Sequence, residues 1–192
     1  TVAGIQDLVI TDHNGCVFTL NTVLTQPAQI QVSFDANYLV GCDPLEVKLT
    51  NTSQEQYLSS WNFGDGSTGA GTETEHTFTG ADCYDVNLEV TDVNGCSNNV
   101  TYAGFICVLE TPVAEIGITN TDLGAYDAEA IITNLSINAD SYSWNLGGMN
   151  DYDYFEPGSH VFPSYTADHF LITLFAYNDN GCLDSTTVLV NF

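Results

Sequence analysis

The sequence contains almost no positive charge: Lys48 is the single basic residue besides four histidines, and arginine is absent. Against 25 acidic residues, this leaves a formal charge of −24 over 192 residues. Such a surface repels phosphate groups, so the composition excludes nucleic-acid binding and disfavours contact with anionic membranes. Cations remain suitable partners, and the charge also keeps neighbouring molecules soluble and apart.

Long apolar runs and helical periodicity are missing as well. No segment approaches the about 18 consecutive apolar residues of a membrane-spanning helix, and no secretory signal peptide is recognisable. Because the chain opens inside a repeated unit, as argued below, we expect targeting signals elsewhere in a longer parent. The nucleophile elbow, the zincin helix and the phosphate-binding loop are also lacking. We therefore interpret the chain as a non-enzyme.

What the sequence does contain is alternation of apolar and polar residues, over 45–49, 83–91 and 170–176. This alternation is typical of strands with one buried face. Turn-forming pairs such as Asn-Gly and Asp-Gly separate the strands. Many short strands with regular turns predict an all-β fold of Ig-like β-sandwiches.

Two kinds of repeat organise the chain. A short string ends in Asn-Gly-Cys three times, at Cys16, Cys96 and Cys182. A longer repeat aligns residues 49–64 with residues 132–147 at a constant offset of 83, with seven identities and no gap. A repeat of that length indicates a whole domain rather than a solenoid turn.

The repeats predict three units arranged end to end. Residues 1–27 form a hairpin from a sandwich whose earlier strands lie outside this sequence, because two isolated strands are marginal in water. Residues 28–109 form one complete sandwich, and residues 110–192 form a second. Linkers of one or two residues predict a stiff arrangement.

Six cysteines in a small polar chain indicate an oxidising, extracellular setting. Cys83 and Cys107 each lie twelve residues from Gly95, so an unbulged hairpin places them opposite each other, within disulfide reach. That bond contributes about 3–4 kcal/mol in the chain-entropy model. Cys42 and Cys96 are then paired by elimination. The alternatives stay open: Cys182 reaches back to Cys42 across the domain junction, Cys16 has lost its partner with the missing strands, or Cys16 or Cys182 is a free thiol.

One short segment resembles the signature of the PKD domain, an Ig-like sandwich whose usual string is Trp-Asp-Phe-Gly-Asp-Gly. The matching residues are Trp61-Asn62-Phe63-Gly64-Asp65-Gly66, and His76-Thr77-Phe78 resembles the His-Thr-Tyr that follows in the family. The second copy matches less well, through Trp144-Asn145-Leu146-Gly147 and Ser159-His160-Val161-Phe162. There Gly148 replaces Asp65, so the second copy lacks the loop carboxylate of the first.

Residues 4–27 resemble the end of SprB-type repeats in large surface adhesins of gliding Bacteroidota, through Val9–Cys16 and Thr25–Pro27. Gly41–Leu45 and the run from Cys96 to Val108 are typical of PKD modules in those proteins. The resemblance implies a long extracellular stalk, as found in gliding-motility proteins exported by type IX secretion.

The tryptophans and histidines of the two copies have simple structural interpretations. Trp61 and Trp144 are predicted core anchors, although an exposed ring would instead suit a carbohydrate-stacking platform. Gly64, Asp65 and Gly66 form a tight turn in which Asp65 caps backbone N–H groups. His76 and His160 occupy equivalent positions, which favours packing and hydrogen bonding over catalysis.

Two acidic groups are candidate calcium sites, because carboxylates suit a hard cation. The first joins Asp65 with Asp82 or Asp85. The second, in the loop after Trp144, contains Asp151, Asp153 and Glu156 beside Tyr152, Tyr154 and Phe155. A solvated loop is the simpler interpretation of the second group, and an adhesive or ion-binding tip is the alternative.

Together these patterns predict a rigid extracellular spacer at the cell surface with adhesive potential. Its expected partners are neighbouring modules of the same parent or identical chains, surface glycans and other surface proteins. Three alternatives remain: a subunit of an extracellular filament or sheath, an accessory module of a secreted hydrolase, and a calcium-dependent adhesion rod.

Overall fold

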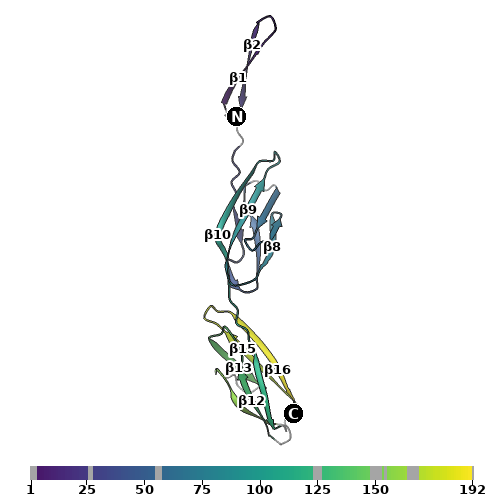
Figure 1. Cartoon of the computed structure of the whole chain (residues 1–192), viewed down its shortest axis with the longest axis vertical. Helices are drawn as coiled ribbons and strands as arrows, with labels where there is room; N and C mark the ends of the chain where they lie inside the picture. Colours follow the sequence, from purple (N-terminus) through teal and green to yellow (C-terminus); the bar gives the residue numbers. More distant parts are fainter. Residues whose placement is uncertain are drawn as a thin grey trace.

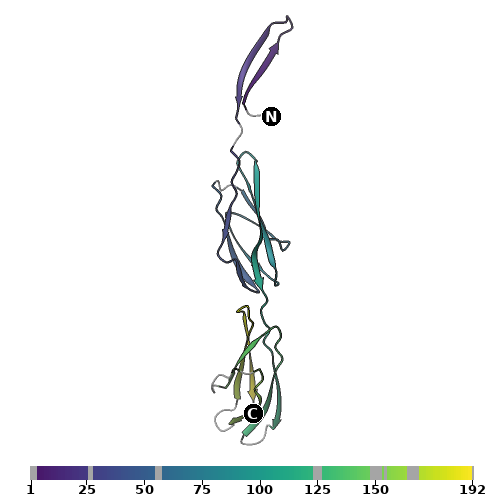
Figure 2. The same ribbon diagram turned by 90° about the vertical axis from the view of Figure 1, so that its left-hand side faces the viewer.

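A computed structural model describes residues 4–25, 28–54, 58–122, 127–147, 153, 155–163 and 169–191. Every regular element in these ranges is a β-strand, so the predicted all-β, Ig-like class is confirmed. A hairpin and two sandwiches follow one another along the long axis of the molecule (Figures 1 and 2). Within the described ranges, no helix is long and apolar enough to cross a membrane.

The N-terminal hairpin consists of β1 (Gly4–Thr11) and β2 (Val17–Leu24), which pair antiparallel. Leu8 lies opposite Leu20 and Ile10 opposite Phe18, so these four apolar residues share one face. All four are exposed, because a two-stranded ribbon has no second layer to cover them.

The first sandwich packs a five-stranded sheet against a three-stranded sheet. The larger sheet has the order β4 (Val40–Cys42), β10 (Ser97–Leu109), β9 (Cys83–Thr91), β6 (Leu58–Asn62) and β7 (Thr68–Ala70). The smaller has the order β3 (Phe34–Ala36), β5 (Leu45–Asn51) and β8 (Glu73–Phe78). Strand β4 pairs with β10 in parallel, and the other pairs are antiparallel.

The second sandwich packs two three-stranded sheets. One has the order β11 (Ile116–Asp122), β12 (Asp127–Asn134) and β14 (Gly158–Pro163). The other has the order β13 (Ser141–Leu146), β15 (His169–Tyr177) and β16 (Leu183–Asn191).

The two cores are built from the alternating residues. Val86, Leu88 and Val90 of β9 are fully buried, as are Ile172 and Leu174 of β15. Each core has its own cluster of buried side chains, one around Trp61 and one around Trp144. Trp61 lies opposite Leu88 in the β6–β9 pair and Trp144 opposite Leu174 in the β13–β15 pair. The sequence repeat is therefore also a structural repeat.

Candidate functional site

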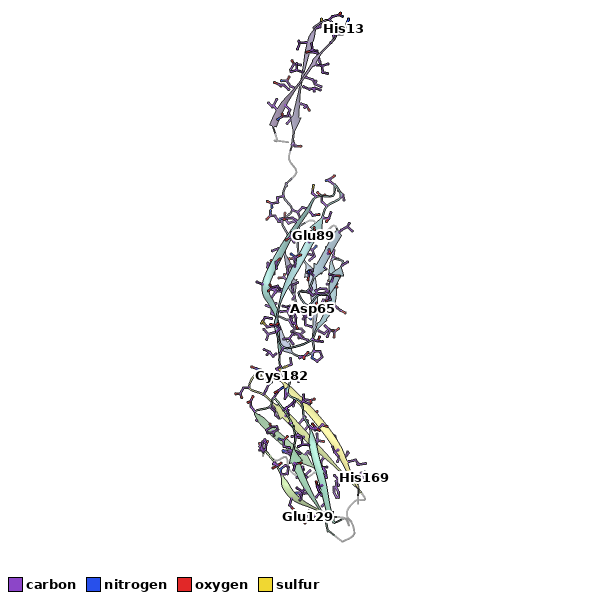
Figure 3. All side chains as sticks on the ribbon, viewed as in Figure 1. His13, Asp65, Glu89, Glu129, His169 and Cys182 are labelled. Atoms are coloured by element: carbon purple, nitrogen blue, oxygen red, sulfur yellow. A yellow bond between two sulfur atoms is a disulfide. The ribbon has the colours of Figure 1, made fainter. Side chains whose placement is uncertain are left out.

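The boundary between the two sandwiches is held by a disulfide bond between Cys42 and Cys182. The Cα atoms are 5.7 Å apart, within the ordinary range for a disulfide. Cys42 ends β4 of the first sandwich, and Cys182 belongs to the β15–β16 turn of the second, where Figure 3 labels it. Cys182 is fully buried. The bond is the alternative that the sequence left open.

The predicted pairing of Cys42 with Cys96 is wrong. Cys42 lies beside Leu109, at the end of the 13-residue strand β10, whereas Cys96 precedes the first residue of that strand. At about 3.3 Å per residue, the two cysteines are about 40 Å apart, at opposite ends of the first sandwich. Pairing by elimination gave the wrong partner because it did not consider that β10 carries the chain from Cys96 to the opposite end of the sandwich. Cys16 and Cys96 are both free and exposed.

Polar contacts of the linker add to the covalent bond. Glu110 accepts hydrogen bonds from two side chains of the second sandwich: Asn178 Nδ2 donates to the backbone oxygen at 2.7 Å and Asn138 Nδ2 to Oε1 at 2.6 Å. On the other side, Thr111 Oγ1 donates to the Asp43 carbonyl at 2.7 Å. The linker is thus tied to both sandwiches.

Sequence reasoning missed these linker contacts, although one signal was available. The turn string begins with Asp12 or Asp92 in the first two copies and with Asn178 in the third. An aspartate carboxylate only accepts hydrogen bonds, whereas an asparagine amide also donates them. The third copy uses this difference, since Asn178 Nδ2 donates to the Glu110 carbonyl.

The predicted Cys83–Cys107 disulfide is present within the first sandwich, but the hairpin that carries it is not unbulged. Tyr102 lies opposite Val86, whereas Ile106 lies opposite Tyr84, so a bulge shifts the register by two residues. Without this shift Cys107 would not face Cys83. Asp85 stabilises the bulge by accepting the Gly104 N–H at 2.6 Å.

In the first sandwich, Asp65, Ser67 and His76 form a compact hydrogen-bonded group. His76 Nε2 lies 2.6 Å from Asp65 Oδ2, and Ser67 Oγ donates to Asp65 Oδ1 at 2.5 Å. The imidazole also stacks on Phe63, with ring centroids 4.2 Å apart. Just before Asp65, Gly64 has φ 85°, and a Cβ there would lie 2.4 Å from the Asp85 carbonyl oxygen. The motif thus fixes the β6–β7 turn against β8 and β9.

The group contains the residue types of a hydrolytic triad but not its geometry. A triad needs the serine at one imidazole nitrogen and the aspartate at the other. Here both contact Nε2, at 3.2 Å for Ser67 Oγ and 2.6 Å for Asp65 Oδ2. The serine proton, moreover, points to the carboxylate. The arrangement suits packing and hydrogen bonding, as predicted from the repeat of the histidine.

The carboxyl group of Asp65 is held ionised by its neighbours. Partial burial raises its pKa, but hydrogen bonds from Ser67 and from His76 lower it more, and the resulting pKa is about 2. Hydrogen bonds that stabilise the charged form have this effect. In the second copy Gly148 supplies no carboxylate, and His160 Nε2 is buried without a hydrogen-bond partner among the described residues.

The carboxylates proposed for calcium make other contacts. Asp65 contacts His76, Asp82 Oδ1 accepts the N–H of Cys83, and Asp85 accepts that of Gly104. Across the described ranges, no three His, Cys, Asp or Glu side chains are grouped to hold a metal ion. In the second acidic group, Glu156 accepts the Asn134 N–H, Asp153 is exposed, and Asp151 lies outside the described residues.

A surface cavity of about 620 Å³ lies beside β13 of the second sandwich. Three aromatic side chains, two aspartates and two serines line it: Tyr142, Phe155, Tyr177, Asp140, Asp153, Ser141 and Ser143. Tyr142 and Phe155 meet edge to face, with centroids 5.4 Å apart. Sequence analysis singled out Asp153 and Phe155 but missed the others, because they come from strand ends that only the fold brings together. By contrast, Trp61 and Trp144 are buried and present no platform.

Residues 25–105 match the PKD domain family. This part of the chain is therefore similar to PKD domains. The match covers the Trp61–Gly66 string, His76 and both sheets of the first sandwich, and it ends within β10. No curated protein matches the sequence.

Several solved structures resemble the chain in fold. One is from a study of carbohydrate-binding modules of the β-sandwich superfamily, at 13% identity and a TM-score of 0.41, covering 88% of this chain and 80% of that one. A Ca²⁺-stabilised, ice-binding adhesin of an Antarctic bacterium has 12% identity and a TM-score of 0.41, covering 96% and 55%. Protocadherin gamma B7 has 14% identity and a TM-score of 0.27, covering 100% and 65%.

Proposed function

We propose that the chain is a non-catalytic segment of an extracellular stalk, in which modules over residues 28–109 and 110–192 hold a distal part of a surface protein away from the cell. The hairpin over residues 1–27 is, on this proposal, the end of a preceding SprB-type module, as in gliding adhesins of Bacteroidota. The similarity to PKD domains and the two disulfides, which are typical of oxidising compartments, support the extracellular location.

The bonded junction is the observation that carries this proposal. Domains joined by a short linker move relative to each other unless their interface is large. Here the Cys42–Cys182 bond and the contacts of Glu110 and Thr111 restrict that motion. A restricted junction is what a spacer requires, because a flexible chain would not hold its end at a fixed distance.

Small-angle X-ray scattering of the oxidised chain tests the proposal. We expect a monomeric, elongated particle whose distance distribution fits the arrangement in Figure 1. A particle that grows with protein concentration would instead support a filament or sheath subunit. A compact or flexible monomer would contradict the spacer.

The cavity beside β13 favours a second candidate function, namely weak binding of a surface saccharide. Aromatic rings contact the apolar faces of sugars, and carboxylates and hydroxyls accept or donate hydrogen bonds to sugar hydroxyl groups. Phe155 and Tyr177 offer exposed rings, and Asp153 offers an exposed carboxylate, around one cavity.

A glycan array probed with the labelled chain, followed by calorimetry with any oligosaccharide that binds, tests this candidate. Phe155→Ala and Tyr177→Ala should each weaken binding at least tenfold. Tyr38→Ala is the matched control, since Tyr38 is an exposed aromatic residue of the first sandwich. Equal binding by all three variants would place the sugar elsewhere. A calcium-dependent rod would be recognised separately, by a heat of Ca²⁺ binding and a melting shift that a chelator reverses.

A further inference from the structure

The free cysteine Cys96 lies in a turn that is built like the turn of the bonded Cys182. Asp92 donates its N–H to the Cys96 carbonyl at 2.8 Å, and Asn178 donates to the Cys182 carbonyl at 3.1 Å. In return, the side-chain oxygen of Asp92 or Asn178 accepts the cysteine N–H at 2.8 or 3.0 Å. The backbone therefore presents the two cysteines in the same way.

The chain segment that enters each sandwich is also held alike. In both sandwiches, the side chain two residues after the turn cysteine makes a hydrogen bond to the backbone of this entering segment. Asn98 Nδ2 donates to the Ile30 carbonyl at 2.7 Å, and Asp184 Oδ2 accepts the Ala114 N–H at 2.8 Å. Each turn thus lies at the end of its sandwich that faces the preceding unit, as the β9–β10 and β15–β16 pairs show in Figure 1.

The two turns differ in what they meet. Cys182 is bonded to Cys42, which ends β4 beside the last residue of β10, Leu109. Cys96 instead is a free, exposed thiol directly before β10. The β9–β10 turn lies at the end of the first sandwich nearest the hairpin of β1 and β2 (Figure 1). In the bonded case the partner cysteine comes from a short strand that runs parallel to the last strand of the preceding sandwich.

The hairpin of β1 and β2 resembles the last strand pair of the first sandwich, β9 and β10, but no second sheet covers it. Leu8 and Ile10 precede their turn by the same spacing as Leu88 and Val90 precede theirs. Leu8 and Ile10 are 52% and 51% exposed, whereas Leu88 and Val90 are fully buried against the opposing sheet. Among the described residues, β2 pairs only with β1, whereas β10 pairs with both β9 and β4.

We propose that Cys96 forms a second inter-module disulfide, with a cysteine on a short strand that pairs in parallel with the end of β2, in a sandwich that β1 and β2 complete. The inference rests on the proposed stalk. In the reaction, two thiols lose two protons and two electrons to a thiol–disulfide oxidoreductase, whose own disulfide is reduced to two thiols. The second sandwich of an identical chain would not supply this cysteine, since the offset of 83 places Ala125 at the position equivalent to Cys42.

Disulfide mapping of the natural protein tests this inference. The protein is isolated from the cells that make it, with free thiols alkylated before lysis. It is then digested with pepsin at low pH, where thiol–disulfide exchange is suppressed. Trypsin is unsuitable because the chain contains only one Lys or Arg. We expect the Cys96 peptide to be linked to a cysteine peptide that does not belong to residues 1–192. In a Cys96→Ser strain that linked pair should vanish, while the Cys42–Cys182 pair persists as the internal control.

Recovery of Cys96 as an alkylated thiol, or linked to Cys16, would overturn the inference. The stalk proposal would survive that result if scattering still showed an elongated monomer with the Cys42–Cys182 bond intact. A flexible or compact particle would overturn the stalk proposal, whatever the state of Cys96.

Discussion

At the scale of single residues, the two copies of the Trp-Asn-x-Gly motif show how one lost carboxylate changes the environment of a histidine. In the first sandwich, Asp65 gives His76 a charged hydrogen-bond partner. In the second, Gly148 occupies the position of Asp65 in the repeat, and burial alone acts on His160 and lowers its pKa. The same fold thus holds one histidine by charge and the other by packing.

Asp65→Asn should destabilise the first sandwich by about 1 kcal/mol near neutral pH, because the charged hydrogen bonds from Ser67 and His76 are weakened. The folded pKa of Asp65, about 2, lies below the ordinary aspartate value of 3.8. The stabilisation is therefore present above pH 3.8 and is lost as the pH falls toward 2. Urea unfolding at several pH values measures it. Asp35→Asn, an exposed carboxylate in the same sandwich, is the control, and an equal loss in both variants would contradict the assignment.

His160→Gln should change the pH dependence of stability rather than only its size. Burial holds the folded pKa of His160 below 6.5, so the unfolded chain binds a proton that the folded chain does not. Stability is then lost as the pH falls below about 6.5. Thermal unfolding between pH 5 and 8 should show this loss in the wild type and a smaller one in the variant. The same slope in both proteins would show that His160 does not contribute.

At the scale of elements, the β9–β10 hairpin shows that a disulfide register depends on a bulge. The bulge residue Gly104 has φ 56°, a left-handed conformation that costs little for glycine only. Asp85 holds this residue through its N–H. The pair of Cys83 and Cys107 is therefore the consequence of local backbone geometry, not of equal spacing around the turn.

Asp85→Ala should destabilise the first sandwich by about 1–2 kcal/mol, because the Gly104 N–H loses its charged acceptor. Glu89→Ala is the matched control: Glu89 lies on the same strand and the same face, is exposed, and is labelled in Figure 3. Chemical denaturation under oxidising conditions gives both values. If the two substitutions cost the same, the bulge does not depend on Asp85.

Strands and turns could be predicted from the sequence because alternation and Asn-Gly pairs act over a few residues. Contacts between modules could not, because they depend on which end of a sandwich each turn occupies. Cys42 and Cys96 fall in one module, yet β10 separates them by its full length. The cavity beside β13 was also invisible, since Asp140, Phe155 and Tyr177 are brought together only by the fold.

At the scale of the whole molecule, the charge of −24 and the bonded junction both favour an extended arrangement. Like charges spread along a chain favour extension and oppose contact between neighbouring molecules, although salt at about 0.15 M screens them beyond about 8 Å. Screening leaves the short-range junction as the structural constraint on the angle between the two sandwiches. The linker contacts and the disulfide should therefore determine how straight the molecule is.

A Cys42→Ser/Cys182→Ser variant should become sensitive to a glutamate-specific protease at Glu110. In the wild type, Glu110 is fixed by Asn138 and Asn178, and the disulfide prevents the two sandwiches from separating. Without the bond these hydrogen bonds open more often, and cleavage follows the population of the open form. We expect cleavage at least tenfold faster than in the wild type, as measured by mass spectrometry.

The Cys16→Ser/Cys96→Ser variant is the control. It removes two thiols but keeps both disulfides, so it should be cleaved at the wild-type rate. Equal rates in all three proteins would mean that the hydrogen bonds of Glu110 hold the junction without the disulfide.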